Sequence, residues 1–227
     1  MSTQLSFNLP ARPALGRDDF FVSPSNAFAV SMIEDWPRWN HRKLLLSGPQ
    51  GSGKTHLTHV WAQSASATVI SASELDEANI ATLAKGPVAV EDVPSIASSE
   101  AGQTALFYLH NLCIEAGQWI MFTGRNTPQH WRLTLPDLDS RMRGTTMADI
   151  YPPDDDLLKA LLIKLFCDRQ LSAPPELINY LVCRIDRSFD SAQRLVCALD
   201  ALSLAEKRPV SRSLAIQLLD TTQDNWL

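Results

Sequence analysis

The sequence lacks the features of a membrane-bound, exported or nucleic-acid-coating protein. No apolar run approaches the roughly 20 residues of a membrane-spanning helix, and residues 1–4 have neither the basic flank nor the apolar core of a signal peptide. Lysine and arginine total 20 against 25 aspartates and glutamates, so the net charge of -5 disfavours a broad basic face for nucleic acid. We therefore expect a cytoplasmic protein with no membrane partner.

Cysteine and histidine form no pattern typical of a metal site. The four cysteines contain no CxxC pair and lie in apolar or helix-like segments, which predicts buried thiols in a reducing compartment. They are Cys113, Cys167, Cys183 and Cys197. His56 and His59 lie three residues apart without a second ligand cluster, so packing is the better interpretation of this pair.

The length and composition predict one sizeable domain or two small ones. The chain has 227 residues, 45% of them hydrophobic, and a domain commonly takes about 150 residues. Prolines and a glycine interrupt residues 1–17, which we expect to be an N-terminal tail. Pro152-Pro153 marks a change of pattern and predicts a boundary there. The expected domains are 18–152 and 153–227.

Up to this boundary, short apolar runs alternate with helix-like segments. The predicted strands are 43–47, 68–70, 87–90 and 119–123, and the predicted helices are 55–65, 74–85 and 100–116. Repeated strand-then-helix units predict an α/β fold with a parallel sheet flanked by helices. After the boundary, leucines recur at helical spacing, and we expect helices near 157–165, 175–184, 188–206 and 211–219. This part is predicted to be a small all-helical domain.

A phosphate-binding loop is the most specific motif in the chain. Residues 48–55 read GPQGSGKT, a complete GxxxxGK[ST], and lie between a predicted buried strand and a predicted helix. Glycines allow successive backbone N–H groups to point at phosphate oxygens, and the helix dipole adds to this attraction. Lys54 is expected to reach the β- and γ-phosphates, and the Thr55 hydroxyl to bind Mg²⁺. The predicted nucleotide-binding residues here are Gly48, Gln50, Gly51, Ser52, Gly53, Lys54, Thr55 and His56.

Acidic and polar residues follow the next two strands. Glu91 and Asp92 end the run 87–90 and supply carboxylates that could hold Mg²⁺ and orient a water molecule. Thr123, Arg125 and Asn126 lie at the end of the run 119–123. They are either contacts to the γ-phosphate or an ordinary surface turn.

From about Asp19 to Leu219 the sequence resembles a DnaA-family AAA+ module. Residues 21–29, FVSPSNAFA, are similar to the segment that frames the adenine in that family, which implies base contacts for Val22, Pro24 and Asn26. Residues 138–144, LDSRMRG, resemble the family's arginine-finger box. The resemblance implies that Arg141 reaches a nucleotide held by a neighbouring subunit, where a cation stabilises the charge on the transferred phosphoryl group.

The amino terminus resembles a peptide that docks on the DNA polymerase sliding clamp. Residues 4–9 read QLSFNL, which implies clamp contacts for Gln4, Leu5, Phe7 and Leu9. The chain ends at residue 227 without the helix-turn-helix domain of the initiator, so we expect no direct origin recognition. This combination is similar to the Hda family of regulators. It implies that the clamp, loaded on DNA, presents the protein to ATP-bound DnaA and that Arg141 then promotes ATP hydrolysis by DnaA.

Three positions depart from the family pattern. Glu91 stands where the family usually has aspartate, and Arg125 stands where an acidic residue is common. Asp190 occupies the position of an expected lid arginine, where an acid would repel phosphates. Arg187 or Arg194 could replace that arginine. The changes imply a chain that binds ADP or ATP with Mg²⁺ and hydrolyses ATP poorly, yet can still supply an arginine in trans.

Two other functions fit parts of the pattern. An autonomous AAA+ ATPase, for example a helicase-loading relative, would form homo-oligomers on ATP and act on single-stranded DNA. A P-loop kinase of small molecules would use the same loop. The clamp-like tail and Asp190 count against the first, and the helical domain and the Arg141 box count against the second.

Overall fold

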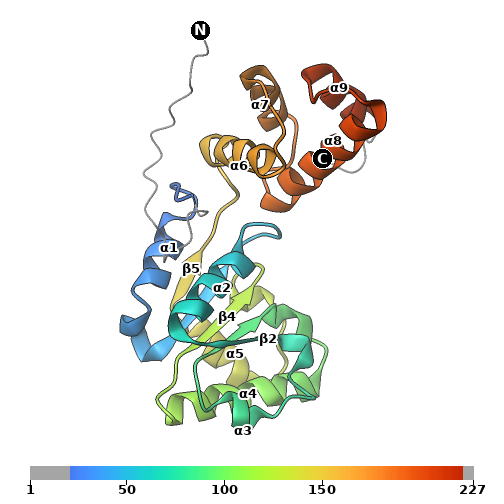
Figure 1. Ribbon diagram of the computed structural model, residues 1–227. Coiled ribbons are helices and arrows are strands. Elements are labelled where there is room, and N and C mark those ends of the chain that lie inside the picture. Colours follow the sequence, from blue (N-terminus) through green and yellow to red (C-terminus); the bar gives the residue numbers. More distant parts are fainter. Residues whose placement is uncertain (1–20, 222–227) are drawn as a thin grey trace.

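The computed structural model describes residues 21–221, and the sheet at its centre has five parallel strands (Figure 1). The strands are β1 (Lys43–Ser47), β2 (Thr68–Ser71), β3 (Val88–Glu91), β4 (Ile120–Gly124) and β5 (Met147–Asp149). Their order is β2-β3-β4-β1-β5, so β1 lies between β4 and β5. Leu45 of β1 pairs with Phe122 on one side and Met147 on the other.

Both faces of the sheet are covered by helices, which explains why consecutive residues within β1, β3 and β4 are apolar. Leu44 and Leu46 pack with α1 (Ala27–Glu34) and α2 (Lys54–Ala65). Leu45 points to the opposite face and packs with α4 (Glu100–Glu115) and α5 (Pro136–Arg143). Short helical turns complete the connections: η1 (Trp36–Arg38), η2 (Asn40–Arg42), η3 (Ala72–Glu74), η4 (Val93–Ile96), η5 (Pro128–His130) and the one-turn α3 (Ile80–Leu83).

The last four helices form a core of their own beyond the carboxyl ends of the strands (Figure 1). They are α6 (Asp155–Asp168), α7 (Pro175–Val182), α8 (Phe189–Glu206) and α9 (Arg212–Thr221). Side-chain caps set two of their starts, because Asp154 accepts a hydrogen bond from the Leu157 amide and Ser188 accepts one from the Ser191 amide. The fully buried Leu158, Leu162 and Leu195 each stabilise this core by about 1.5–3 kcal/mol.

The predicted fold class, a parallel sheet flanked by helices and followed by a helical region, is confirmed. The predicted helix 74–85 is wrong. Asn79 caps a new start through its bond to the Thr82 amide, so a 3-10 turn and the one-turn α3 replace it. The strand β5 and the helices α1 and α5 had no prediction. β5 is only three residues long, which is too short for a periodic signal to be recognised.

The expectation for the cysteines is correct for one of the four. Cys113 lies on the buried face of α4, and burial raises the pKa of its thiol to about 12. Cys167, Cys183 and Cys197 are exposed on the helical region, because they fall on the outer faces of their helices. Within residues 21–221, no group of three or more His, Cys, Asp or Glu side chains is placed to hold a metal. The same part of the chain has no helix that is both long and apolar enough to cross a membrane.

Candidate nucleotide site

The loop that joins β1 to α2 has a backbone that only glycine accommodates easily. Gly51 and Gly53 have φ values of 68° and 94°, in the left-handed region. A Cβ atom on Gly48 would lie 2.6 Å from the Ile150 carbonyl oxygen. The loop therefore turns tightly from the end of β1 into the amino terminus of α2, where free N–H groups and the helix dipole favour an anion.

Lys54, the first residue of α2, reaches back across this loop. Its Nζ donates hydrogen bonds to the carbonyl oxygens of Gly48, at 2.8 Å, and Pro49, at 2.6 Å. Burial lowers the pKa of Lys54 and so does the nearby Arg125, whereas Asp92 and Glu91 raise it. The structure thus places four of the residues singled out in the sequence close enough to influence one another electrostatically.

The end of β3 supplies the two acids. Glu91 is the last residue of the strand, and its Oε1 is buried with no hydrogen-bond partner among residues 21–221. Asp92 adopts a left-handed φ of 54°, and its amide donates a 3.0 Å hydrogen bond to the Thr123 hydroxyl. An unpartnered buried carboxylate oxygen close to Lys54, with Thr55 exposed on α2, is a donor set that fits Mg²⁺ bound together with a nucleotide.

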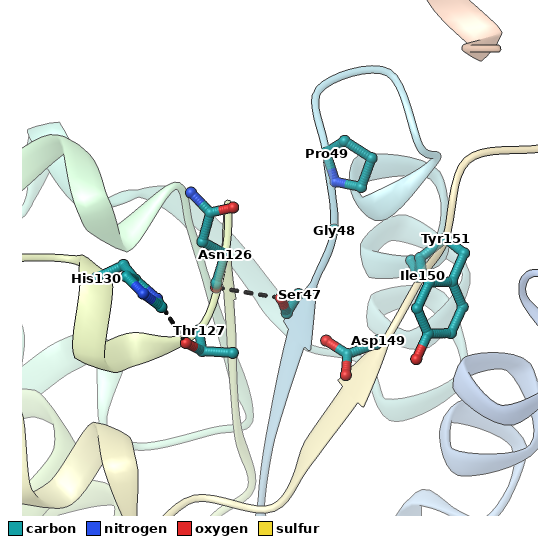
Figure 2. A pocket seen from close by; sticks show the side chains of 9 residues that line it. All are labelled: Ser47, Gly48, Pro49, Asn126, Thr127, His130, Asp149, Ile150 and Tyr151. Atoms are coloured by element: carbon teal, nitrogen blue, oxygen red, sulfur yellow. Dashed lines mark hydrogen bonds between the residues drawn. The ribbon is translucent and has the colours of Figure 1, made fainter.

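A cavity of about 520 Å³ opens beside this loop, between the ends of β1, β4 and β5 (Figure 2). Ser47 at the end of β1 and Asn126 in the loop after β4 line one side, and the Ser47 hydroxyl donates a 3.1 Å hydrogen bond to the Asn126 carbonyl oxygen. Asp149 and Tyr151 line its opposite side, and Tyr151 is 60% exposed. Neither residue was predicted, because the strand that positions them gave no signal.

Trp131 fixes the loop that follows β4. Its indole Nε1 donates hydrogen bonds to the carbonyl oxygens of Arg125, at 2.7 Å, and Asn126, at 3.1 Å. A Cβ atom on Gly124 would lie 2.4 Å from the same ring, so the indole lies directly under the strand end. The segment 123–126 was interpreted either as a set of γ-phosphate contacts or as a surface turn. Thr123 is buried and accepts a hydrogen bond from the Asp92 amide, whereas Arg125 and Asn126 are exposed.

The helical region touches the phosphate loop through the start of α8. The Phe189 amide donates a 2.8 Å hydrogen bond to the Gly51 carbonyl oxygen. A Cβ atom on Gly51 would lie 3.1 Å from the Cβ atoms of both Ser188 and Asp190. A cavity of about 240 Å³ lies between the loop and α8, lined by Lys54 and Thr55 on one side and by Asp190 and Gln193 on the other.

The two arginines proposed to replace the missing lid arginine are both ion-paired. Arg187 contacts Asp155 on α6, with a nitrogen–oxygen distance of 2.7 Å. Arg194 contacts Asp190, with a distance of 3.1 Å, so it partly neutralises the acid that faces the loop. Asp190, the partner of Arg194, lines the cavity at the phosphate loop, whereas the partner of Arg187 belongs to α6.

The segment predicted to frame the base lies next to the end of β5. Asn26 is buried, and its side chain accepts a hydrogen bond from the Ser23 amide and donates one to the Phe21 carbonyl. This turn is tied to the sheet by the bond from the Tyr151 amide to the Ser25 carbonyl. Asn26 therefore shapes the segment, while Val22 is half-buried and Pro24 is exposed.

In the phosphate loop itself Gln50 is exposed and Ser52 is buried, and His56 is half-buried on α2.

Arg141 lies at the other end of the sheet. It is exposed on α5 and lines a cavity with Lys43, the first residue of β1. The four strand steps from Lys43 to Ser47 separate this cavity from the phosphate loop by roughly 13 Å. That distance exceeds the reach of an arginine side chain, so Arg141 cannot touch a nucleotide on its own loop.

The predicted clamp-binding residues Gln4, Leu5, Phe7 and Leu9 lie outside the described residues.

No family model matches the chain, but related proteins and structures are found. The chromosomal replication initiator protein DnaA of Thermomicrobium roseum is 24% identical over 89% of this chain. DnaA of Symbiobacterium thermophilum gives the same identity and coverage of this chain. The matched region spans 48% and 49% of these two proteins, so the chain spans about half the length of the curated relatives it matches.

Solved structures of DnaA have a fold similar to that of this chain. Domain III of DnaA from Thermotoga maritima superposes with a TM-score of 0.75 at 22% identity, covering 93% of this chain and 98% of that one. An AMPPCP-bound DnaA from Aquifex aeolicus gives a TM-score of 0.74 at 17% identity, covering 94% and 71%. The strand order, the helical region and these similarities together give the chain the fold of a DnaA-like AAA+ domain.

Proposed function

We propose that this protein is a nucleotide-binding AAA+ regulator of DNA replication initiation, similar to the Hda family. It holds ADP or ATP at its own phosphate loop and promotes ATP hydrolysis by DnaA through Arg141. Residues 18–152 form the nucleotide-binding unit and 153–227 the lid. The tail, through Gln4, Leu5, Phe7 and Leu9, docks on the sliding clamp and so brings the protein to DNA.

Nucleotide binding is supported by the chemistry of the carboxyl end of the sheet. The glycine loop presents backbone N–H groups, Lys54 supplies a positive charge, and the buried Oε1 of Glu91 is available to the metal. Mg²⁺ bound with the nucleotide would neutralise phosphate charge. Thr55 and Glu91 would hold it, while Asp92 and Thr123 keep the end of β3 in position. The DnaA of Aquifex aeolicus, which shares this fold, holds the ATP analogue AMPPCP.

One observation carries the regulatory part of the proposal: Arg141 is exposed and lies at the end of the sheet opposite its own phosphate loop. No ion pair or side-chain hydrogen bond of Arg141 is found among residues 21–221, whereas Arg143 on the same helix contacts Asp139 at 2.8 Å. A cation in this position can stabilise phosphoryl-transfer charge only on a second molecule. DnaA is the partner that the resemblance suggests.

The test measures how fast ATP-bound DnaA loses its γ-phosphate in the presence of sliding clamp loaded on DNA. We expect the protein to accelerate this loss. Arg141→Ala should reduce the acceleration at least about 100-fold, because an arginine finger raises the rate of hydrolysis by about 10³–10⁵. Arg143→Ala is the matched control, because it removes a neighbouring arginine of the same helix, and it is expected to stay active. No acceleration by the unmodified protein, or equal acceleration by Arg141→Ala, would contradict the proposal.

The tail is tested separately. Gln4→Ala combined with Leu5→Ala is expected to abolish clamp binding and leave nucleotide binding unchanged, because these residues would anchor an extended peptide in pockets of the partner. Surface plasmon resonance with immobilised clamp measures the first, and titration with ADP measures the second. An unchanged affinity for the clamp would refute the assignment of the tail.

A second candidate function is autonomous ATP hydrolysis, as in a helicase loader. It is favoured by the proximity of Lys54, Glu91 and Asp92, which together resemble a complete hydrolytic site. ATP turnover by the protein alone, stimulated by single-stranded DNA and rising with protein concentration, would support this alternative over the regulator.

A further inference from the structure

The cavity beside Arg141 is lined mainly by polar side chains and lies at the amino end of the sheet. It has a volume of about 450 Å³ and is lined by Lys43 from β1, His110 from α4, and Asp137 and Arg141 from α5. Lys43 follows the same alternation as Leu45 and so points toward the layer of α4 and α5. Two basic side chains from different elements therefore meet at one cavity.

Lys43 is unusual for a residue at the start of a central strand. Only 8% of its surface is exposed, and its ammonium group has no ion pair or hydrogen bond among residues 21–221. Burial lowers the pKa of Lys43 and the adjacent Arg141 lowers it further. A cation that has lost part of its hydration and lies next to a second cation is more stable when an anion joins the two. No residue within the described range supplies that anion, since Asp137 is exposed and pairs with neither cation.

The surroundings of Lys43 also contain a buried polar atom without a partner and a strained backbone. His110 is 2% exposed, and its Nε2 is buried with no hydrogen-bond partner among residues 21–221. His41, which also lines the cavity, and Arg42 have φ values of 51° and 56°, two consecutive left-handed residues that are not glycine. Such strain is typical of functional sites. Arg42 itself is engaged elsewhere, with the Gly117 carbonyl and the ring of Trp119.

We propose that Lys43 and Arg141 together form a binding site for a phosphate-class anion, in which Lys43 is a second cation not assigned by the sequence. Lysine acts on phosphate as a compact charge and arginine as a planar donor, so the pair suits an oxyanion with several charged oxygens. The phosphate comes either from solution or from a nucleotide held by a neighbouring molecule. The second source rests on the proposed function of Arg141.

The first arm of the test uses inorganic phosphate. The protein is saturated with ADP and Mg²⁺ to fill its own phosphate loop, and its lysines are labelled with ¹³C. The Lys43 ¹³Cε signal, assigned with Lys43→Met, is followed during a phosphate titration, with sodium chloride at equal ionic strength as the control. A saturable shift with phosphate and none with chloride is expected for a free-phosphate site, and Arg141→Ala should weaken the binding at least about tenfold.

The second arm uses ATP-bound DnaA with loaded clamp. Lys43→Met is expected to reduce the acceleration of hydrolysis at least about tenfold, and Lys43→Arg to restore part of it, while Arg143→Ala remains active. Because Lys43→Met removes a charge that lies beside Arg141 without an ion pair or hydrogen bond among residues 21–221, its melting temperature should equal or exceed that of the unmodified protein. A merely structural lysine would instead give a lower melting temperature.

The two arms separate the outcomes. A phosphate-dependent shift with normal acceleration by Lys43→Met identifies free phosphate as the ligand. If free phosphate gives no shift and Lys43→Met reduces the acceleration, the ligand is the phosphate of a nucleotide held by a neighbouring molecule. No shift together with unchanged acceleration overturns the inference. If the unmodified protein does not accelerate DnaA, the proposed function fails, and the phosphate titration alone decides whether the site exists.

Discussion

The two ends of the central sheet both present a partly buried lysine, but they treat its charge differently. At the carboxyl end, two carbonyl oxygens accept hydrogen bonds from Lys54, and the acids Glu91 and Asp92 offset its charge. At the amino end, Lys43 has no such acceptor among residues 21–221 and lies beside Arg141. A cation with internal acceptors is held in place without a ligand, whereas one without them is stabilised by water or by an anion from outside. This difference supports the proposal of a nucleotide site at the first end and of a site for an anion from outside the chain at the second.

The largest expected effect is at the carboxyl end. Lys54→Ala removes the cation that would contact two phosphate groups, and charged hydrogen bonds of this kind contribute about 1.5–3 kcal/mol each. We expect the affinity for ADP with Mg²⁺ to fall at least about 100-fold in isothermal titration. Lys85→Ala, at an exposed turn, is the matched control. Retained affinity in Lys54→Ala would remove the basis for the proposed nucleotide site.

A smaller effect is expected from the contact between the phosphate loop and α8. Gly51→Ala places a side chain on a residue with φ of 68° and 3.1 Å from the Cβ atoms of Ser188 and Asp190. The left-handed conformation alone costs about 1–2 kcal/mol, so both the melting temperature and the nucleotide affinity should fall. Gly86→Ala is the control, because nothing lies within 4 Å of the added atom. Equal melting temperatures for the two variants would show that the lid does not rest on the loop.

Trp131→Phe tests how far the loop after β4 depends on one indole. The change removes the donor to the carbonyls of Arg125 and Asn126 and is expected to cost about 1 kcal/mol in urea unfolding. Trp119→Phe is the matched control, since its Nε1 is buried with no hydrogen-bond partner among residues 21–221. A larger loss in Trp119→Phe than in Trp131→Phe would contradict this assignment.

The smallest effect concerns pH and the amino end. Burial lowers the pKa of His110 from its ordinary 6.5, Lys43 and Arg141 lower it further, and the bond to Asn111 partly opposes this. Below pH 6.5 the unfolded chain takes up a proton that the folded protein does not, so stability should fall as the pH drops from 6.5 toward the lower folded pKa. Urea unfolding of His110→Gln between pH 7.5 and 5.5 should show a shallower loss.

His59→Gln is the control for that series, because His59 is exposed on α2. It should follow the pH dependence of the unmodified protein. If His110→Gln does so as well, His110 is not a buried neutral histidine in solution.

Part of the candidate site could be predicted because its residues are consecutive. The loop 48–55 brings its glycines, Lys54 and Thr55 together through local geometry alone, and the acids 91–92 follow directly from a strand end. Tyr151, Trp131 and Phe189 were not foreseen as parts of this region. They reach it from β5, from the turn after η5 and from α8, and no periodic pattern in the chain relates those segments to the loop.

The sequence by itself determined the parallel sheet and the helices that carry strong periodicity. Buried strands are continuous apolar runs and amphipathic helices have apolar residues at helical spacing, so both can be recognised from local residue order. Only the tertiary structure decided that Lys43 and Arg141, nearly 100 residues apart, meet at one cavity. It also decided that Asp190 rather than an arginine faces the phosphate loop and that Arg194 partly neutralises it. Electrostatic environment depends on the distances between side chains of different elements, and those distances exist only after the layers have packed.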